Sequence, residues 1–302
     1  MKSLEVDARP PFPFRLPSYS SEDRVMSVRD GVVSRLLRVG ESPVLVRAWQ
    51  PAGGRVVLRA EAVDPGALTA PRSIPSEDSR PAKADELGLA VERMRFALGV
   101  DDDLGEFHRR FRRDPLLGPQ LRRRPWLRPR RRPLPWEALA WAVVKQLIES
   151  ERAARIQRRI VGRWGTRLGR ERGGLRDVPG AATIAARAPA ELASMDLSPA
   201  RSIALRAVAA QVAAGRCDLA DPIADRRLLA VPEIGPWTVR CLGLLGRGDP
   251  DALPAGDLIY LKLVGRLARL GRRATVEEVE EFYAPYEPFR GLAGLWTIGL
   301  YK

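Results

Sequence analysis

Few side chains in this sequence could act as nucleophiles or as metal ligands. There is one histidine, His108, and there are two cysteines, Cys217 and Cys241. Two cysteines cannot complete a tetrahedral zinc site or an iron–sulfur cluster, and a single histidine excludes most triad chemistry. We therefore expect no resident metal or cluster, and any chemistry has to rely on carboxylates.

The stretch VPEIGPWT, residues 231–238, reads as a tight hairpin between two helices. We expect Ile234 to anchor the turn in the core, Gly235 to supply a positive φ, and Pro236 to begin the second helix. Unpaired backbone amides at that helix start would form an anion site suited to one phosphate. A plain corner between helices is the common alternative for an isolated Gly-Pro turn.

A carboxylate follows the hairpin in the stretch LPAGDLIYLKLVGRL, which places Asp257 at the start of another helix. Taken alone, this residue reads as a helix N-cap that contributes about 1 kcal/mol. The hairpin shortly before it in the chain favours a second interpretation, in which Asp257 is a catalytic carboxylate.

The charge balance predicts a polyanionic partner. The chain carries 51 Lys and Arg against 37 Asp and Glu, a net charge of +14, and residues 101–200 hold 22 of the basic and 12 of the acidic residues. The segment 122–133, RRRPWLRPRRRP, contains seven arginines. It could be an extended strap on phosphates or a solvated linker, and arginine-rich solvated faces are the alternative for the whole excess.

The apolar pattern predicts a protein without membrane segments. No run of 18 apolar residues occurs, and the first thirty residues lack the apolar core of a signal peptide. We expect a monomeric protein of the cytoplasm or nucleoid.

Two regions differ in their secondary-structure signals. Residues 24–62 alternate Val, Leu and Arg between Asp-Gly and Gly-Gly turns, which is typical of an antiparallel β-meander. Residues 64–84 are rich in Pro, Ser and Ala, and from residue 85 onward the apolar residues follow helical spacing. The sequence therefore predicts a mainly α protein with an N-terminal antiparallel-sheet domain over 1–84 and a helical region over 85–302.

Three stretches together resemble a known family. The hairpin PEIGPWT, the downstream PAGD and the upstream helix AVVKQLIES are similar to those of the helix-hairpin-helix DNA glycosylases, and most similar to the 3-methyladenine DNA glycosylase II (AlkA) type. The resemblance runs from about Pro11 to the end. It implies a two-lobed helical architecture in which the C-terminal helices pack back on residues 85–115.

The resemblance also assigns roles to residues. Asp257 takes the position of the catalytic aspartate, and Gln146 and Leu147 take that of the pair whose leucine wedges into the duplex. Further sets follow from the same resemblance and from the basic run: the phosphate-binding hairpin is Glu233, Ile234, Gly235, Pro236 and Thr238; the base pocket is Trp237, Cys241 and Trp296; and the basic DNA contacts are Arg128, Arg130, Arg131 and Arg132.

Departures from the family refine the expected reaction. Relatives that also cut the strand use a lysine near position 237 to form a Schiff base, and Trp237 therefore predicts a monofunctional hydrolase. Cys241 replaces an aromatic residue, and Trp296 lies two residues out of register with the pocket tryptophan. The four-cysteine cluster of another branch has no counterpart, and a monovalent cation on the hairpin carbonyls remains an open option.

Glu233 stands where the family usually has a glycine. We expect it to adopt a left-handed backbone conformation at a cost of about 1 kcal/mol and to add negative charge beside the phosphate. The resemblance implies excision of alkylated purines from double-stranded DNA. The alternatives are a DNA-binding protein with little or no catalysis and a glycosylase for a deaminated or oxidised base.

Overall fold

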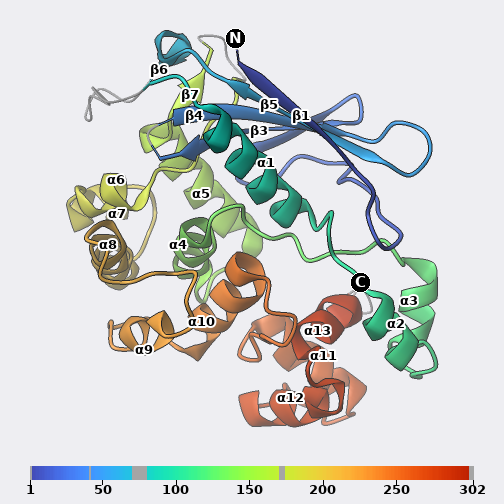
Figure 1. The fold of residues 1–302 in the computed structure, drawn as a ribbon. Coiled ribbons are helices and arrows are strands. Elements are labelled where there is room, and N and C mark those ends of the chain that lie inside the picture. The colour runs from blue at the N-terminus through green and yellow to red at the C-terminus, as the bar shows by residue number, and fades with distance from the viewer. Residues whose placement is uncertain (1, 41, 70–79, 170–173, 299–302) are drawn as a thin grey trace.

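The N-terminal region of the chain is an antiparallel sheet (Figure 1). A computed structural model describes residues 2–40, 42–69, 80–169 and 174–298. Five strands pair in the order β1-β5-β4-β3-β2. They are β1 (Ser3–Ala8), β2 (Met26–Arg29), β3 (Val32–Val39), β4 (Ser42–Trp49) and β5 (Val56–Ala62). The predicted meander is confirmed. Strand β1, which pairs with β5, was not predicted.

Turn chemistry and alternation of side chains set the register of the sheet. Asp30 and Gly31, with φ of 49° and 75°, form the two-residue turn between β2 and β3 that matches the strand twist. Leu36 and Leu37 face opposite sides, as neighbours on a strand must. Leu37 packs in the core under helix α1 (Ala84–Leu98), and Leu36 packs with Leu45 and Val63 on the other face.

Helix α1 (Ala84–Leu98) belongs to the sheet domain. Its buried residues, from Leu87 to Leu98, share one core with the inner face of the sheet. The boundary expected between residues 84 and 85 therefore separates α1 from the strands it covers, and the structure corrects it. The apolar stripe of an isolated amphipathic helix does not reveal which domain it covers.

The remaining helices form two further cores (Figure 1). One contains α4 (Pro135–Lys145), α5 (Ser150–Trp164), α6 (Ala181–Ala185), α7 (Pro189–Ala193), α8 (Pro199–Ala213), α9 (Ala224–Leu228) and α10 (Pro236–Leu242). The other joins α2 (Gly105–Phe111) and α3 (Gly118–Arg123) to α11 (Leu258–Leu267), α12 (Val276–Tyr283) and α13 (Arg290–Ile298). The C-terminal helices were expected to pack on residues 85–115. They pack on residues 104–121 and not on α1.

Helix α4 runs through the middle of the protein and is buried on all sides from Trp136 to Val144. Its first turn contains Glu137, which is 0% exposed and receives a 2.6 Å hydrogen bond from Arg35 of β3. Nearby, the Asp23 carboxylate accepts hydrogen bonds from Arg132 at 2.6 Å and from the Trp141 indole at 2.9 Å. Charged groups therefore join the sheet to the central helix.

The arginine run before α4 corrects a second expectation. Arg128 is 7% exposed and donates to backbone carbonyls that include those of Gly99 and Pro13. Arg131 pairs with Asp102 at 2.5 Å, and Arg132 pairs with Asp23. These three guanidiniums face inward because the segment crosses between lobes and meets buried carboxylates and carbonyls. Arg130 is exposed and stacks on Tyr19 at 3.8 Å.

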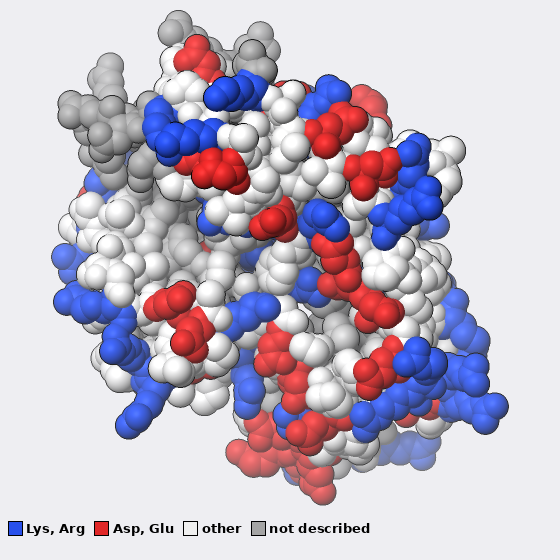
Figure 2. All heavy atoms as spheres, viewed as in Figure 1, with Lys and Arg blue, Asp and Glu red and all other residues white. Residues whose placement is uncertain are grey.

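Surface charge on the face seen in Figure 2 is of mixed sign. Basic and acidic side chains alternate over most of it, and acidic atoms gather at the bottom of the view, where Figure 1 places the acidic helix α12. The net positive charge therefore does not form one continuous basic field on this face. No helix in the described parts of the chain has the length and apolar character needed to span a bilayer.

A prediction concerns Asp177, which is 5% exposed beside the Arg35–Glu137 pair. Burial, and then the nearby Glu137, raise the pKa of this carboxyl from 3.8 to about 7. A carboxyl with a raised pKa favours its protonated form in the folded state. Its contribution to the stability of the folded state is therefore complete below pH 3.8 and is lost as the pH rises through about 7.

Asp177→Asn cannot ionise, and its amide oxygen can still accept the 2.7 Å hydrogen bond from the Val178 N–H. We expect the melting temperature to exceed that of wild type by about 3 °C or more at pH 8, which corresponds to ~1 kcal/mol, and the gain to shrink toward pH 4.5. Glu22→Gln, at an exposed position, is the control. A gain of equal size at both pH values would contradict the assignment.

Candidate nucleic-acid interface and active site

The predicted hairpin joins α9 to α10, and its backbone differs from the expectation at one position. Ile234 is 5% exposed and anchors the turn, and Pro236 is the first residue of α10. Gly235 does not have a positive φ; its φ is −107°, the extended conformation of an N-cap. Glu233 takes the left-handed conformation, with φ of 70°, as expected.

The end of α4 is tied to this hairpin. The amide Nε2 of Gln146 donates to the Glu233 carbonyl at 2.8 Å and to Thr238 Oγ1 at 2.9 Å. Thr238, which was predicted to face a phosphate, is 1% exposed and so acts here as an internal partner. Gln146 therefore joins the predicted wedge to the predicted phosphate-binding hairpin.

Leu147 is held out in solvent. Its side chain is 103% exposed, and its backbone φ is 53°, a conformation that costs a non-glycine residue about 1 kcal/mol or more. Apolar side chains of this size are usually at least partly covered. A fully exposed leucine on a strained backbone is the arrangement expected of a residue that inserts into a partner.

Arg201 of α8 supports this strained turn, and the sequence analysis did not identify it. Its Nη1 donates to the carbonyls of Val144 at 3.2 Å and Gln146 at 3.0 Å, and its Nε donates to Ser198 Oγ at 2.9 Å. One guanidinium thus satisfies two carbonyls where α4 ends. No local sequence signal pairs residues 55 positions apart, although Ser198 was recognisable as a helix N-cap.

Asp257 combines the two interpretations that the sequence left open. It caps α11, because its Oδ1 accepts from the Ile259 N–H at 3.0 Å. Its Oδ2 accepts from the indole N–H of Trp237 at 3.3 Å. The side chain is half-buried, and each oxygen keeps lone-pair capacity for a further partner. The cap therefore fixes a carboxylate against the first turn of the hairpin helix.

Cys241 of α10 lies close to the Asp257 carboxylate. It is 8% exposed, and burial, followed by the charge of Asp257, raises the pKa of its thiol. The thiol is thus neutral and unsuited to act as a nucleophile. Trp237, Cys241 and Asp257 form one neighbourhood beside the hairpin.

Trp296 is placed elsewhere, in the core of the C-terminal helices. It is 1% exposed, stacks on Phe107 at 6.4 Å and meets the ring of His108 at 5.8 Å. Its indole nitrogen has no hydrogen-bond partner among the described residues, and neither does His108 Nε2. Burial, then Arg128, lowers the pKa of His108 to about 4. A pocket role for Trp296 remains a prediction, since the side chain reaches no open surface.

The sequence is similar to those of known DNA-repair proteins. No protein-family model matches the chain. It is 26% identical over 229 residues to the DNA-3-methyladenine glycosylase of Bacillus subtilis, covering 73% of this chain and 76% of that protein. A stretch of 73 residues is 41% identical to a probable bifunctional transcriptional activator/DNA repair enzyme AlkA of Mycobacterium tuberculosis, covering 24% of this chain and 14% of that protein.

Solved structures share the fold. The 3-methyladenine DNA glycosylase from Archaeoglobus fulgidus superposes with a TM-score of 0.78 at 19% identity, covering 98% of both chains. MBOgg1 in complex with a low-affinity DNA ligand gives 0.71 at 16% identity, covering 99% of this chain and 97% of that one. The family resemblance and the fold class predicted from the sequence are confirmed.

The positive φ of Glu233 leads to a prediction. We expect Glu233→Gly to raise the free energy of unfolding by about 1 kcal/mol, because glycine adopts the left-handed conformation without the Cβ penalty. It should also tighten DNA binding, because a negative charge beside the anion site is removed. Thermal unfolding and fluorescence anisotropy with a DNA duplex measure the two effects.

Glu233→Gln is the matched control, since it removes the charge and keeps the strain. It should tighten DNA binding without raising stability. Unchanged or weaker DNA binding in both variants would show that the glutamate points away from the phosphate or makes a useful contact.

Proposed function

We propose that this protein is a monofunctional DNA glycosylase of base excision repair, which hydrolyses the N-glycosidic bond of alkylated purines flipped out of duplex DNA. The observation that carries the proposal is the Asp257 carboxylate, held 3.3 Å from the indole N–H of Trp237 on the hairpin helix. The sequence similarity to DNA-3-methyladenine glycosylases supports the 3-methyladenine class of substrate.

The chemistry suits a single carboxylate. A purine alkylated at a ring nitrogen is cationic and leaves with the electron pair of the glycosidic bond, which puts positive charge on the sugar. Asp257 stabilises that charge electrostatically, and water adds to C1′ and gives up a proton to complete the hydrolysis. Because Oδ1 is fixed by the Ile259 N–H, the carboxylate needs no reorganisation when the charge develops.

The target base has to leave the duplex first, and Leu147 is the residue we assign to this step. Flipping costs a few kcal/mol, least for a damaged pair. Insertion of a leucine that is 103% exposed recovers part of that cost by removing apolar surface from water. The hydrogen bond from Gln146 to the Glu233 carbonyl fixes Leu147 relative to the hairpin.

Position 237 supports hydrolysis without strand cleavage. A strand-cleaving relative would need an amine beside the catalytic carboxylate to form a Schiff base with the sugar. In this chain an indole N–H occupies that place, and an indole cannot act as the nucleophile. The product is then an abasic site in an uncut strand.

A second candidate is the same reaction on a deaminated or oxidised base. It is favoured by the pocket, where Cys241 replaces an aromatic residue and Trp296 is buried in the core at 1% exposure. A shared fold cannot decide between bases, since one neighbour with a TM-score of 0.61 at 14% identity is an 8-oxoguanine glycosylase/lyase.

The test of catalysis compares wild type with Asp257→Asn on duplexes that carry methylated, deaminated or oxidised bases. Asn keeps the N-cap, so the fold should persist. We expect base release from the methylated duplex to slow by on the order of 100- to 1,000-fold, measured as alkali-cleaved product. Equal rates would remove Asp257 from its role, and no release by wild type from any duplex would end the enzymatic proposal. Strand scission without alkali would contradict hydrolysis alone.

The hydrogen bonds of Arg201 to the turn that carries Leu147 give a separate prediction. Arg201→Met keeps the aliphatic stem and loses the hydrogen bonds to the Val144 and Gln146 carbonyls. We expect about tenfold slower release of a paired damaged base, since charge-assisted bonds of this kind contribute ~1.5–3 kcal/mol and part of that holds the wedge. The same base placed opposite a one-nucleotide gap needs less wedging and should lose much less rate.

Arg206→Met is the control, because Arg206 is exposed on the same helix and its side chain has no hydrogen bond to any described residue. An equal loss on the paired and gapped duplexes would show that Arg201 acts through general stability or direct DNA contact and not through the wedge.

A further inference from the structure

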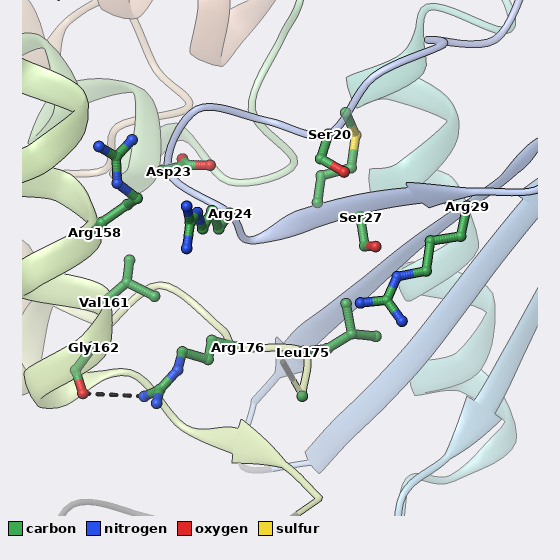
Figure 3. Close-up of a pocket in the computed structure, with 12 residues that line it drawn as sticks. Ser20, Asp23, Arg24, Ser27, Arg29, Arg158, Val161, Gly162, Leu175 and Arg176 are labelled. Carbon is green, nitrogen blue, oxygen red and sulfur yellow. Dashed lines mark hydrogen bonds between the residues drawn. The ribbon is translucent and has the colours of Figure 1, made fainter. Parts of the chain in front are cut away.

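A hollow of about 440 Å³ lies between the edge of the sheet and α5, apart from the hairpin and Asp257 (Figure 3). Its walls come from β2 and the loop before it, from the second half of α5, and from residues 174–176. Four arginines line it: Arg24, Arg29, Arg158 and Arg176. The volume of the hollow is within the range of small-ligand sites, roughly 300–1,000 Å³.

Where these guanidiniums have a described partner, it is a carbonyl and not a carboxylate. In the described parts of the chain no carboxylate forms an ion pair with any of them, although many other arginines are paired. Arg158 donates to the Glu22 carbonyl at 2.9 Å and Arg176 to the Gly162 carbonyl at 3.0 Å. A carbonyl orients a guanidinium and leaves its charge in place, so the hollow holds an uncompensated positive field.

The one acid in the lining cannot balance this charge. Asp23 is 1% exposed, and its Oδ2 accepts from Arg132 and from the Trp141 indole. Burial alone would raise the pKa of this carboxyl, but Arg132 and Arg35 outweigh it and bring the pKa to about 2. The Asp23 carboxylate is thus held by Arg132 and Trp141 and forms no ion pair with the four arginines of the hollow.

The neighbouring backbone and hydroxyls add two features. Arg24 has φ of 62°, a conformation that a glycine would adopt at lower cost, so this turn places a charged side chain where strain disfavours one. Ser20 Oγ accepts from the Val28 N–H at 2.9 Å, which leaves its hydroxyl hydrogen free to donate. The Ser27 hydroxyl also faces the hollow (Figure 3).

We propose that this hollow is a second anion site, whose arginines bind phosphate. Guanidiniums recognise phosphate oxygens in pairs, and hydroxyls complete the shell. The site is distinct from the hairpin of the proposed function and does not depend on catalysis.

The phosphate has two possible sources, the backbone of bound DNA or a free phosphorylated molecule. Helix α5 begins at Ser150, three residues after Leu147, and Arg158 lies about 12 Å further along its axis. That length is well within one turn of a duplex, about 34 Å. DNA that meets the wedge could therefore place a flanking phosphate over the hollow, and the experiment separates this from binding of free phosphate.

The test uses the double variant Arg24→Gln/Arg29→Gln, in which both side chains are exposed and neither has a hydrogen-bond partner among the described residues. Arg113→Gln/Arg123→Gln is the control, because it removes two exposed charges beside α2 and α3. Thermal unfolding is measured in pyrophosphate and in chloride at equal ionic strength. DNA affinity is measured from 50 to 200 mM salt with a 30-base-pair duplex.

Two results would each support the site. Stabilisation of wild type by pyrophosphate that is lost in the double variant, and kept in the control, would identify free phosphate as a ligand. If DNA is the source, the 30-base-pair duplex should lose about tenfold less affinity across the salt range in the double variant than in wild type or control, because two phosphate contacts are gone. A double variant that matches the control in both assays would overturn the proposal, and activity on damaged bases does not enter into it.

Discussion

The Glu137 carboxylate, buried in the first turn of α4, is the constraint on which the rest of the structure depends. Burial raises its pKa, so the group is tolerated only where Arg35 of β3 meets it at 2.6 Å. That pair sets where α4 lies against the sheet. Since α4 is buried from Trp136 to Val144, its position and direction then decide where Gln146 and Leu147 emerge at its far end.

Two strained residues share one set of hydrogen bonds. Glu233 and Leu147 both have positive φ, and Gln146, which precedes Leu147, donates to the Glu233 carbonyl. Hydrogen bonds therefore hold the hairpin and the proposed wedge together, and Arg201 binds the same turn through the Gln146 carbonyl. Backbone strain of this kind persists only where surrounding contacts over-determine it, and here the contacts come from three helices.

Local signals predicted much of this molecule, and long-range contacts account for what they missed. The meander and the fold class follow from turn residues and side-chain spacing within short windows of sequence. The left-handed conformation of Glu233 was expected from the family resemblance. The inward orientation of Arg128 and Arg131 depends on carbonyls and carboxylates about thirty positions away, such as those of Gly99 and Asp102. The assignment of α1 to the sheet and the role of Arg201 likewise depend on contacts that no sequence window contains.

The fully exposed Leu147 also has a consequence for how such a protein would search DNA. Because the Leu147 side chain already extends into solvent, no rearrangement of the core has to precede its contact with DNA. Its insertion contributes at most about 1.5–3 kcal/mol, similar to the cost of opening a weakened pair and below that of opening several sound ones. A side chain of this size would therefore set a threshold: sound pairs would resist it and be released quickly, and pairs already weakened by damage would yield.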